Sequence, residues 1–112
     1  MAYDEELAER IRELVAAERT LTEQKMFGGL AFLIGGNIAV AASGQGGLLV
    51  RVDPEESDTL VGKTKAKPMV MRGRPMQGWV RVPAEAVRTK PQLRKWIELG
   101  ISYAHSLPVK KK

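Results

Sequence analysis

The stretch that decides the fold reads Leu30-Ala31-Phe32-Leu33-Ile34-Gly35-Gly36-Asn37-Ile38-Ala39-Val40-Ala41-Ala42. Two apolar runs flank Gly35-Gly36-Asn37, and glycine and asparagine tolerate the backbone of a tight turn. A third run over residues 48–52 follows another glycine-rich turn at residues 44–47. Connections this short join antiparallel strands, because a parallel crossover needs a dozen or more residues. The sequence therefore predicts an antiparallel meander of three strands.

A helix is predicted before the meander and a second one directly after it. Apolar residues from Leu7 to Val15 recur at helical spacing, which predicts an amphipathic helix over residues 3–19. After the meander, Asp53-Pro54 followed by two glutamates is typical of a capped helix start. This second helix is expected to end near Gly62.

Two more strands and a last helix complete the predicted domain. Strands are expected over residues 69–71 and 79–82, with a turn at residues 72–75 between them. Apolar residues at helical spacing predict the last helix over residues 90–106. Gly100 falls on its apolar face, where it would let the helix approach the sheet closely.

The predicted order is α-β-β-β-α-β-β-α, which indicates an α+β fold with an antiparallel five-stranded sheet and helices packed on it. We expect a single domain over residues 1–107 and a basic C-terminal tail over residues 108–112.

The composition excludes several kinds of functional site. The 112 residues include no cysteine and one histidine, so neither a disulfide framework nor an ordinary zinc site is expected, and we predict no metal and no cofactor. No glycine pair is followed by the Lys-Ser/Thr of a phosphate-binding loop. With no catalytic constellation in the sequence, we expect a protein that is not an enzyme; an enzyme or small-ligand carrier with a hidden pocket is the minority alternative.

The sequence favours a cytoplasmic protein without membrane contact. No apolar run approaches the roughly 20 residues that a membrane span needs. The acidic start, Met1-Ala2-Tyr3-Asp4-Glu5-Glu6, differs from the basic start of a signal peptide.

Charge is unevenly distributed along the chain. Residues 1–24 carry a net charge of −4 (three basic, seven acidic residues), whereas residues 25–112 carry +9 (fifteen basic, six acidic). One basic stretch holds the candidate contacts for nucleic acid or a partner: Arg72, Arg74, Arg81, Arg88, Lys90, Arg94 and Lys95. Trp79 lies inside that stretch and would stack on a base if its ring faced outward. The alternative is an ordinary solvated surface.

A set of motifs resembles the N-terminal domain of the TfoX/Sxy family. The most specific stretch is Lys25-Met26-Phe27-Gly28-Gly29-Leu30-Ala31-Phe32. It is followed in order by Gly36-Asn37, Leu49-Val50-Arg51-Val52-Asp53, Gly73-Arg74-Pro75-Met76, Trp96 and Tyr103-Ala104. The resemblance implies an α+β domain with an antiparallel sheet. Members include bacterial regulators that promote transcription of DNA-uptake (competence) genes alongside a cyclic-AMP receptor protein. Those regulators carry a second, helical domain, which has no counterpart in the printed sequence.

The motif residues carry their own structural expectations. Met26 and Phe27 are expected as core anchors, and Gly28-Gly29 would allow a bulge or a tight approach. Gly73 and Pro75 belong to the predicted turn. Arg51 and Arg74 have chemistry beyond packing, because a guanidinium clamps a carboxylate or phosphate with two parallel hydrogen bonds. The alternative for Arg51 is an ion pair with Asp53 or Glu55.

Two functional hypotheses follow. The first is a small regulatory or adaptor domain that binds a protein partner, a transcription factor by family resemblance, through an open sheet edge or a helix face. Homodimerisation would use the same surfaces. The second is direct, weak binding of nucleic acid through the basic stretch at residues 72–95.

Overall fold

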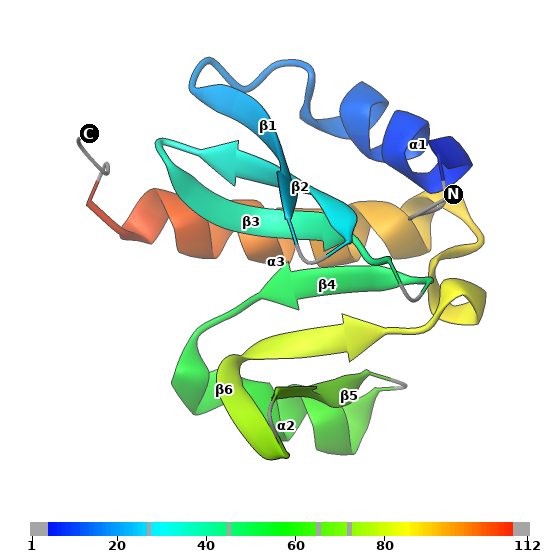
Figure 1. The fold of residues 1–112 in the computed structure, drawn as a ribbon, viewed down its shortest axis with the longest axis vertical. Helices are drawn as coiled ribbons and strands as arrows, with labels where there is room; N and C mark the ends of the chain where they lie inside the picture. The colour runs from blue at the N-terminus through cyan, green and yellow to red at the C-terminus, as the bar shows by residue number, and fades with distance from the viewer. Residues whose placement is uncertain (1–4, 27, 45, 65, 72, 109–112) are drawn as a thin grey trace.

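One antiparallel sheet of six strands, in the order β1-β2-β3-β4-β6-β5, organises the computed structural model, which describes residues 5–26, 28–44, 46–64, 66–71 and 73–108 (Figure 1). The strands are β1 (Leu21–Met26), β2 (Gly29–Ile34), β3 (Asn37–Ala42), β4 (Leu48–Arg51), β5 (Lys67–Met71) and β6 (Arg74–Val82). The helices are α1 (Glu5–Val15), α2 (Pro54–Lys63), the short 3-10 helix η1 (Ala84–Val87) and α3 (Lys90–Ser106).

The α+β class and the antiparallel sheet are confirmed, but the prediction of five strands is wrong. The missed strand is β1, which pairs with β2 along its whole length, from Leu21 opposite Ile34 to Met26 opposite Gly29. Its sequence, Leu-Thr-Glu-Gln-Lys-Met, lacks the apolar alternation of a half-buried strand. An edge strand with exposed polar side chains does not need that alternation, and charge there discourages pairing with other chains.

Several boundaries also differ from the predicted ones. The turn expected over residues 72–75 is shorter, because Arg74 and Pro75 already belong to β6 and pair with Met71 and Val70 of β5. The first described helix ends at Val15 rather than at residue 19. The short helix η1 has no counterpart in the predicted order.

Both later helix starts follow their sequence signals. The Asp53 side chain accepts a hydrogen bond from the Glu55 backbone N–H at 2.9 Å, with Pro54 at the first helical position. Thr89 and Gln92 form a reciprocal capping box at the start of α3. The predicted span of α3, residues 90–106, is therefore confirmed.

The main core lies between the sheet and the helices, which cover one face of the sheet (Figure 1). Strand residues at alternate positions, such as Phe32, Val50 and Val80, are fully buried there. They pack with the apolar stripes of α1 and α3, including Ile11 and Ile97. Among the described residues, no helix is both long and apolar enough to cross a membrane.

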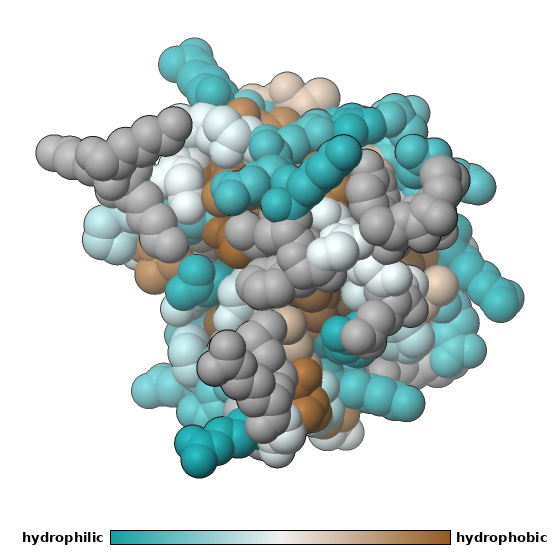
Figure 2. Space-filling model, in the orientation of Figure 1, coloured by the Kyte–Doolittle hydropathy of each residue, from teal (hydrophilic) through white to brown (hydrophobic). Residues whose placement is uncertain are grey.

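A second apolar cluster lies on the other face of the sheet, and all of its members among the described residues come from strands. Its buried members are Ala31, Leu33, Ala41, Leu49 and Met69, with the half-buried Ile38 and Trp79 packed against them. Figure 2 looks onto this face, where apolar side chains occur at intervals down the middle and hydrophilic ones gather around the rim. We call it the helix-free face.

Gly100 sets how closely α3 packs on the sheet. A Cβ at this position would lie 2.4 Å from the Ala39 carbonyl oxygen and 2.9 Å from Cγ1 of Val40. No side chain fits such a gap, so glycine allows the backbone of α3 to lie directly against β3. The prediction that Gly100 allows a close approach is confirmed.

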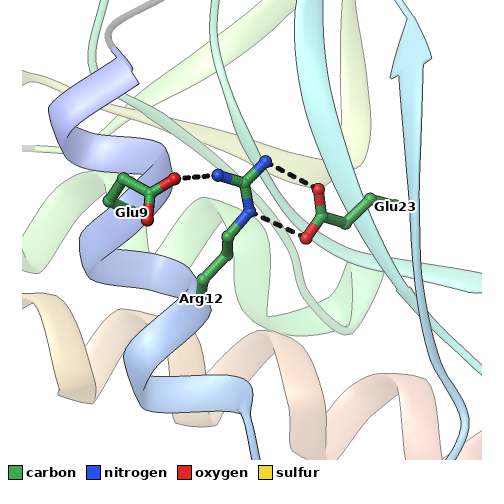
Figure 3. Close-up of polar contacts among 3 residues, drawn as sticks. All are labelled: Glu9, Arg12 and Glu23. Atoms are coloured by element: carbon green, nitrogen blue, oxygen red, sulfur yellow. Dashed lines mark hydrogen bonds and ion pairs between the residues drawn. The ribbon is translucent and has the colours of Figure 1, made fainter.

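A pair of charged residues ties the edge strand to the first helix (Figure 3). Arg12 of α1 donates to both carboxylate oxygens of Glu23 on β1, at 2.9 Å from Nε and 2.8 Å from Nη2. Glu9, one turn earlier on α1, also pairs with Arg12. The hydrogen bonds from Arg12 lower the pKa of Glu23 below its ordinary value.

Replacing Gly100 with alanine is expected to destabilise the fold by about 3 kcal/mol, the upper range for overpacking, because the new methyl group meets backbone rather than a flexible side chain. Gly62, near the end of α2, is the matched control: a Cβ there meets nothing within 4 Å. Gly62→Ala should raise stability by about 0.5–1 kcal/mol through helix propensity. Urea denaturation of both variants measures this, and equal effects would contradict the proposed close approach.

Glu23→Gln is expected to lower stability at neutral pH and to have less effect in acid. Since Arg12 lowers the pKa of Glu23 in the folded state, the pair stabilises the fold above the unfolded-chain pKa. That contribution disappears as the pH falls through the folded-state pKa. Urea denaturation at pH 7 and pH 3 should show the gap to the parent protein closing in acid. Glu13→Gln, on the exposed face of α1, controls for loss of a charge, and a pH-independent gap would refute the pairing.

Candidate functional site

The glycine pair of the first motif lies where β1 turns into β2. Gly28 has a φ of +73°, and a Cβ on Gly29 would lie 2.1 Å from the Ala42 carbonyl oxygen. The expected tight approach at Gly28-Gly29 is thus confirmed, and it seats β2 against β3. Met26 ends β1, but its side chain and the whole of Phe27 lie outside the described residues, so their role as core anchors stays a prediction.

The third motif forms the hairpin between β5 and β6. Gly73 has a φ of +78° in the turn. Arg74 is exposed, and within the described part of the chain it has no ion pair or hydrogen-bonding side-chain partner. Pro75 pairs with Val70, the exposed apolar residue of the edge strand β5. This motif shapes one end of the sheet and does not bring Arg74 to Arg51, which pairs with Trp79 farther along β6.

Arg51 occupies a distinct position at the end of β4. The pairing of β3 with β4 stops at Val40 and Val50, so Arg51 lies beyond the last pair. Val50 and Val52 belong to the core on the helix side, and Arg51 therefore starts toward the helix-free face, as strand alternation predicts.

Two aromatic rings hold the Arg51 guanidinium. Its central carbon lies 5.6 Å from the ring centroid of Trp79 on β6 and 5.8 Å from that of Tyr103 on α3. Both distances are within the roughly 6 Å over which a cation is attracted to a ring face. Arg51, Trp79 and Tyr103 together are called the arginine–aromatic cluster below.

The expected ion pair of Arg51 with Asp53 or Glu55 is not formed. Asp53 uses its carboxylate to cap α2 through the Glu55 N–H, and within the described ranges Arg51 has no hydrogen bond or ion pair. The cation is positioned by stacking alone. Unlike the exposed Arg74, Arg51 is thus half-buried and held by rings while its hydrogen-bond donors stay without a partner among the described residues.

The basic stretch does not form one patch. Arg81 lies on β6 and donates a hydrogen bond to Ser43 Oγ at 3.2 Å, Arg74 lies in the β5–β6 hairpin, and Arg72 is outside the described residues. The other four residues, Arg88, Lys90, Arg94 and Lys95, cluster around the start of α3, and three of them line one shallow pocket of about 260 Å³ with Glu98. We call these four the α3 basic group.

Trp79 is separated from the α3 basic group by the sheet. Its ring packs against the strand-built cluster of the helix-free face, whereas the basic group belongs to η1 and α3 on the other side. Trp79 and the α3 basic group therefore do not form one surface, and stacking of Trp79 on a base stays a prediction. Strand alternation turns Trp79 away from the helices, and the start of α3 carries the cations to the opposite side.

A larger pocket than the one beside the α3 basic group also lies along the helices. It has a volume of about 510 Å³ and lies between α2, η1 and α3, with Leu60, Ala86, Trp96 and Leu99 as its apolar lining. Within the ranges that the structure describes, no group of three or more histidine, aspartate and glutamate side chains is placed to hold a metal ion.

Sequence reasoning did not find the part that Tyr103 plays. The residue lies on a different element from Arg51, and no spacing rule links a strand end to a distant helix. The signal available was its presence in the family motif, and only the packing of α3 on β3 brings its ring to the guanidinium.

Comparison with known proteins identifies the domain type. The sequence model of the TfoX N-terminal domain matches residues 13–104, from the second half of α1 to the last turns of α3. That family is a non-enzymatic one, in agreement with the expectation drawn from the sequence. A search of curated proteins gave no match.

Proposed function

The chain belongs to the TfoX N-terminal domain family, and we propose that it acts as a regulatory or adaptor module through contacts with a protein partner. The observation that carries the proposal is the division of the sheet. The described helices cover one face (Figure 1). The other face carries a buried apolar cluster built from the strands, bordered by the half-buried side chains of Ile38, Trp79 and Arg51. A face that combines apolar residues with tryptophan and arginine has the composition found at the centres of protein interfaces.

The edges of the sheet support the same proposal. Strands β1 and β5 each pair on one side only. On β5, Val70 is 57% exposed and is the large hydrophobic residue that the described chain leaves most open. β1 instead carries exposed charge at Lys25, which disfavours strand addition. The β5 edge therefore offers an exposed apolar residue to a partner strand, whereas the β1 edge carries charge.

The class of partner follows from the family resemblance. Competence regulators of this family act on transcription, so a transcription factor is the partner class we propose. A second copy of this chain is the other partner that the same face would accommodate.

Site-specific photocross-linking tests the proposed face. A benzophenone amino acid in place of Ile38, on the helix-free face, should cross-link a protein in cells that express the chain naturally. The same amino acid in place of Asp58, exposed on α2, is the matched control and should give no such product. Recovery of the same product from both positions, or from the Asp58 position alone, would contradict the proposal.

Nucleic-acid binding is the second candidate function, and the α3 basic group is the observation that favours it. Lys90, Arg94 and Lys95 surround one pocket, and within the described residues none of the three has an acidic partner. Such a group would neutralise phosphates and release their counterions.

A salt titration measures that contribution. If the α3 basic group contacts phosphates, replacing Lys90, Arg94 and Lys95 with alanine should reduce the slope of log K against log salt by about 3 on a random DNA duplex. The control replaces Lys25, Lys67 and Arg74, which are exposed on strands, and removes the same charge. Fluorescence anisotropy between about 50 and 200 mM salt gives both slopes. Equal slopes for the two triple variants would exclude this group as the site.

A further inference from the structure

We propose that Arg51 is the anchor for a carboxylate side chain on the protein partner, held ready by the rings of Trp79 and Tyr103. The inference rests on the proposed function and adds to it the chemistry that the partner must present. Three properties of the site support it: the order of the guanidinium, its unused donors and the nature of its surroundings.

Stacking orders the guanidinium without using its hydrogen bonds. Trp79 and Tyr103 contact the cation at 5.6 and 5.8 Å from its central carbon. Contacts with ring faces leave the five N–H donors, which lie in the guanidinium plane, available. A side chain that is already fixed loses less conformational entropy when it binds, so it is suited to recognition.

Arg12 and Arg81 have hydrogen-bond acceptors for their guanidinium groups, and Arg51 has none among the described residues. Arg12 is saturated by Glu23 and Glu9, and Arg81 donates to Ser43. Arg51 is half-buried, yet its nearest acid in sequence, Asp53, is occupied by the start of α2. A half-buried cation with ordered and unused donors is complementary to an anion from outside the chain.

The surroundings favour a carboxylate on an apolar segment over a polyanion. The guanidinium of Arg51 lies between two aromatic rings, and one of them, Trp79, packs against the apolar cluster of the helix-free face. The α3 basic group, which a phosphate backbone would need, lies on the opposite side of the sheet. An extended segment with one acidic side chain and apolar side chains two residues away on the same side matches this pattern.

Two-dimensional NMR of the indole N–H groups tests the anchor without altering the protein. The probe is the capped peptide acetyl-Leu-Ala-Glu-Ala-Leu-amide, with a glutamine version as its matched control. The glutamate peptide should shift the Trp79 signal in a saturable way and leave in place that of Trp96, which belongs to the buried face of α3. The glutamine peptide should bind at least ten-fold more weakly. Equal shifts from both peptides would overturn the proposal.

Variants and a second anion locate the effect. Arg51→Ala and Arg51→Lys should each weaken binding of the glutamate peptide at least ten-fold, because lysine lacks the planar fork. Arg74→Ala should leave the affinity within two-fold. If Arg51→Lys bound the glutamate peptide as tightly as the parent protein, recognition by the two parallel N–H groups of the guanidinium would be wrong. If inorganic phosphate shifted the Trp79 signal as strongly as the glutamate peptide does, the preference for a carboxylate would be wrong.

The two proposals fail separately. Cross-linking at Ile38 combined with no glutamate-dependent shift overturns the Arg51 anchor and leaves the binding face intact. A glutamate-dependent shift that Arg51→Lys removes, combined with no cross-linking at Ile38, supports the carboxylate site and overturns the protein-binding role.

Discussion

The contact between α3 and β3 is the constraint on which the rest of the structure depends. At Gly100 the helix backbone meets the Ala39 carbonyl with no room for a Cβ, so a 17-residue amphipathic helix lies directly against the central strands. This contact buries Trp96 and Ile97 on the helix side of the sheet. It also brings the later turns of the helix past the end of β4, where Tyr103 reaches Arg51. Gly100, which the packing requires, thus helps to place Tyr103 beside Arg51, whose hydrogen-bond donors have no partner among the described residues.

The sheet separates two kinds of surface. On the helix side, apolar side chains from strands and helices form the main core, and the α3 basic group lies at its outer margin. On the helix-free face lies a smaller apolar cluster whose described members are all strand residues. Trp79 joins it to the arginine–aromatic cluster, to which α3 contributes Tyr103 from the other side. Stability depends mainly on the first face, because most of the buried large side chains are there.

Much of the fold was predictable because its signals are local. The Gly35-Gly36 turn, the Asp53-Pro54 helix start and the helical spacing of residues 90–106 each specify an element within a few residues. β1 was not predicted because an edge strand buries little and needs no apolar alternation. Arg74 was assigned to a turn because glycine and proline flank it, whereas the strand pairing resumes at Arg74 itself. The site was less predictable. Arg51 stood out as motif chemistry, but its unpaired state depends on Asp53 capping a helix, and its stacking depends on Tyr103, which only tertiary packing brings near.

The central claim is that Trp79 and Arg51 are accessible to other molecules on one side of the sheet, while helices close the opposite side. Acrylamide quenching of tryptophan fluorescence tests it directly, because Trp79 and Trp96 lie on the two faces. The Trp96→Phe variant retains Trp79 alone, and the Trp79→Phe variant retains Trp96 alone. We predict several-fold stronger quenching of Trp79, which is half-buried, than of Trp96, which is 7% exposed. Equal quenching of the two, or stronger quenching of Trp96, would contradict the account.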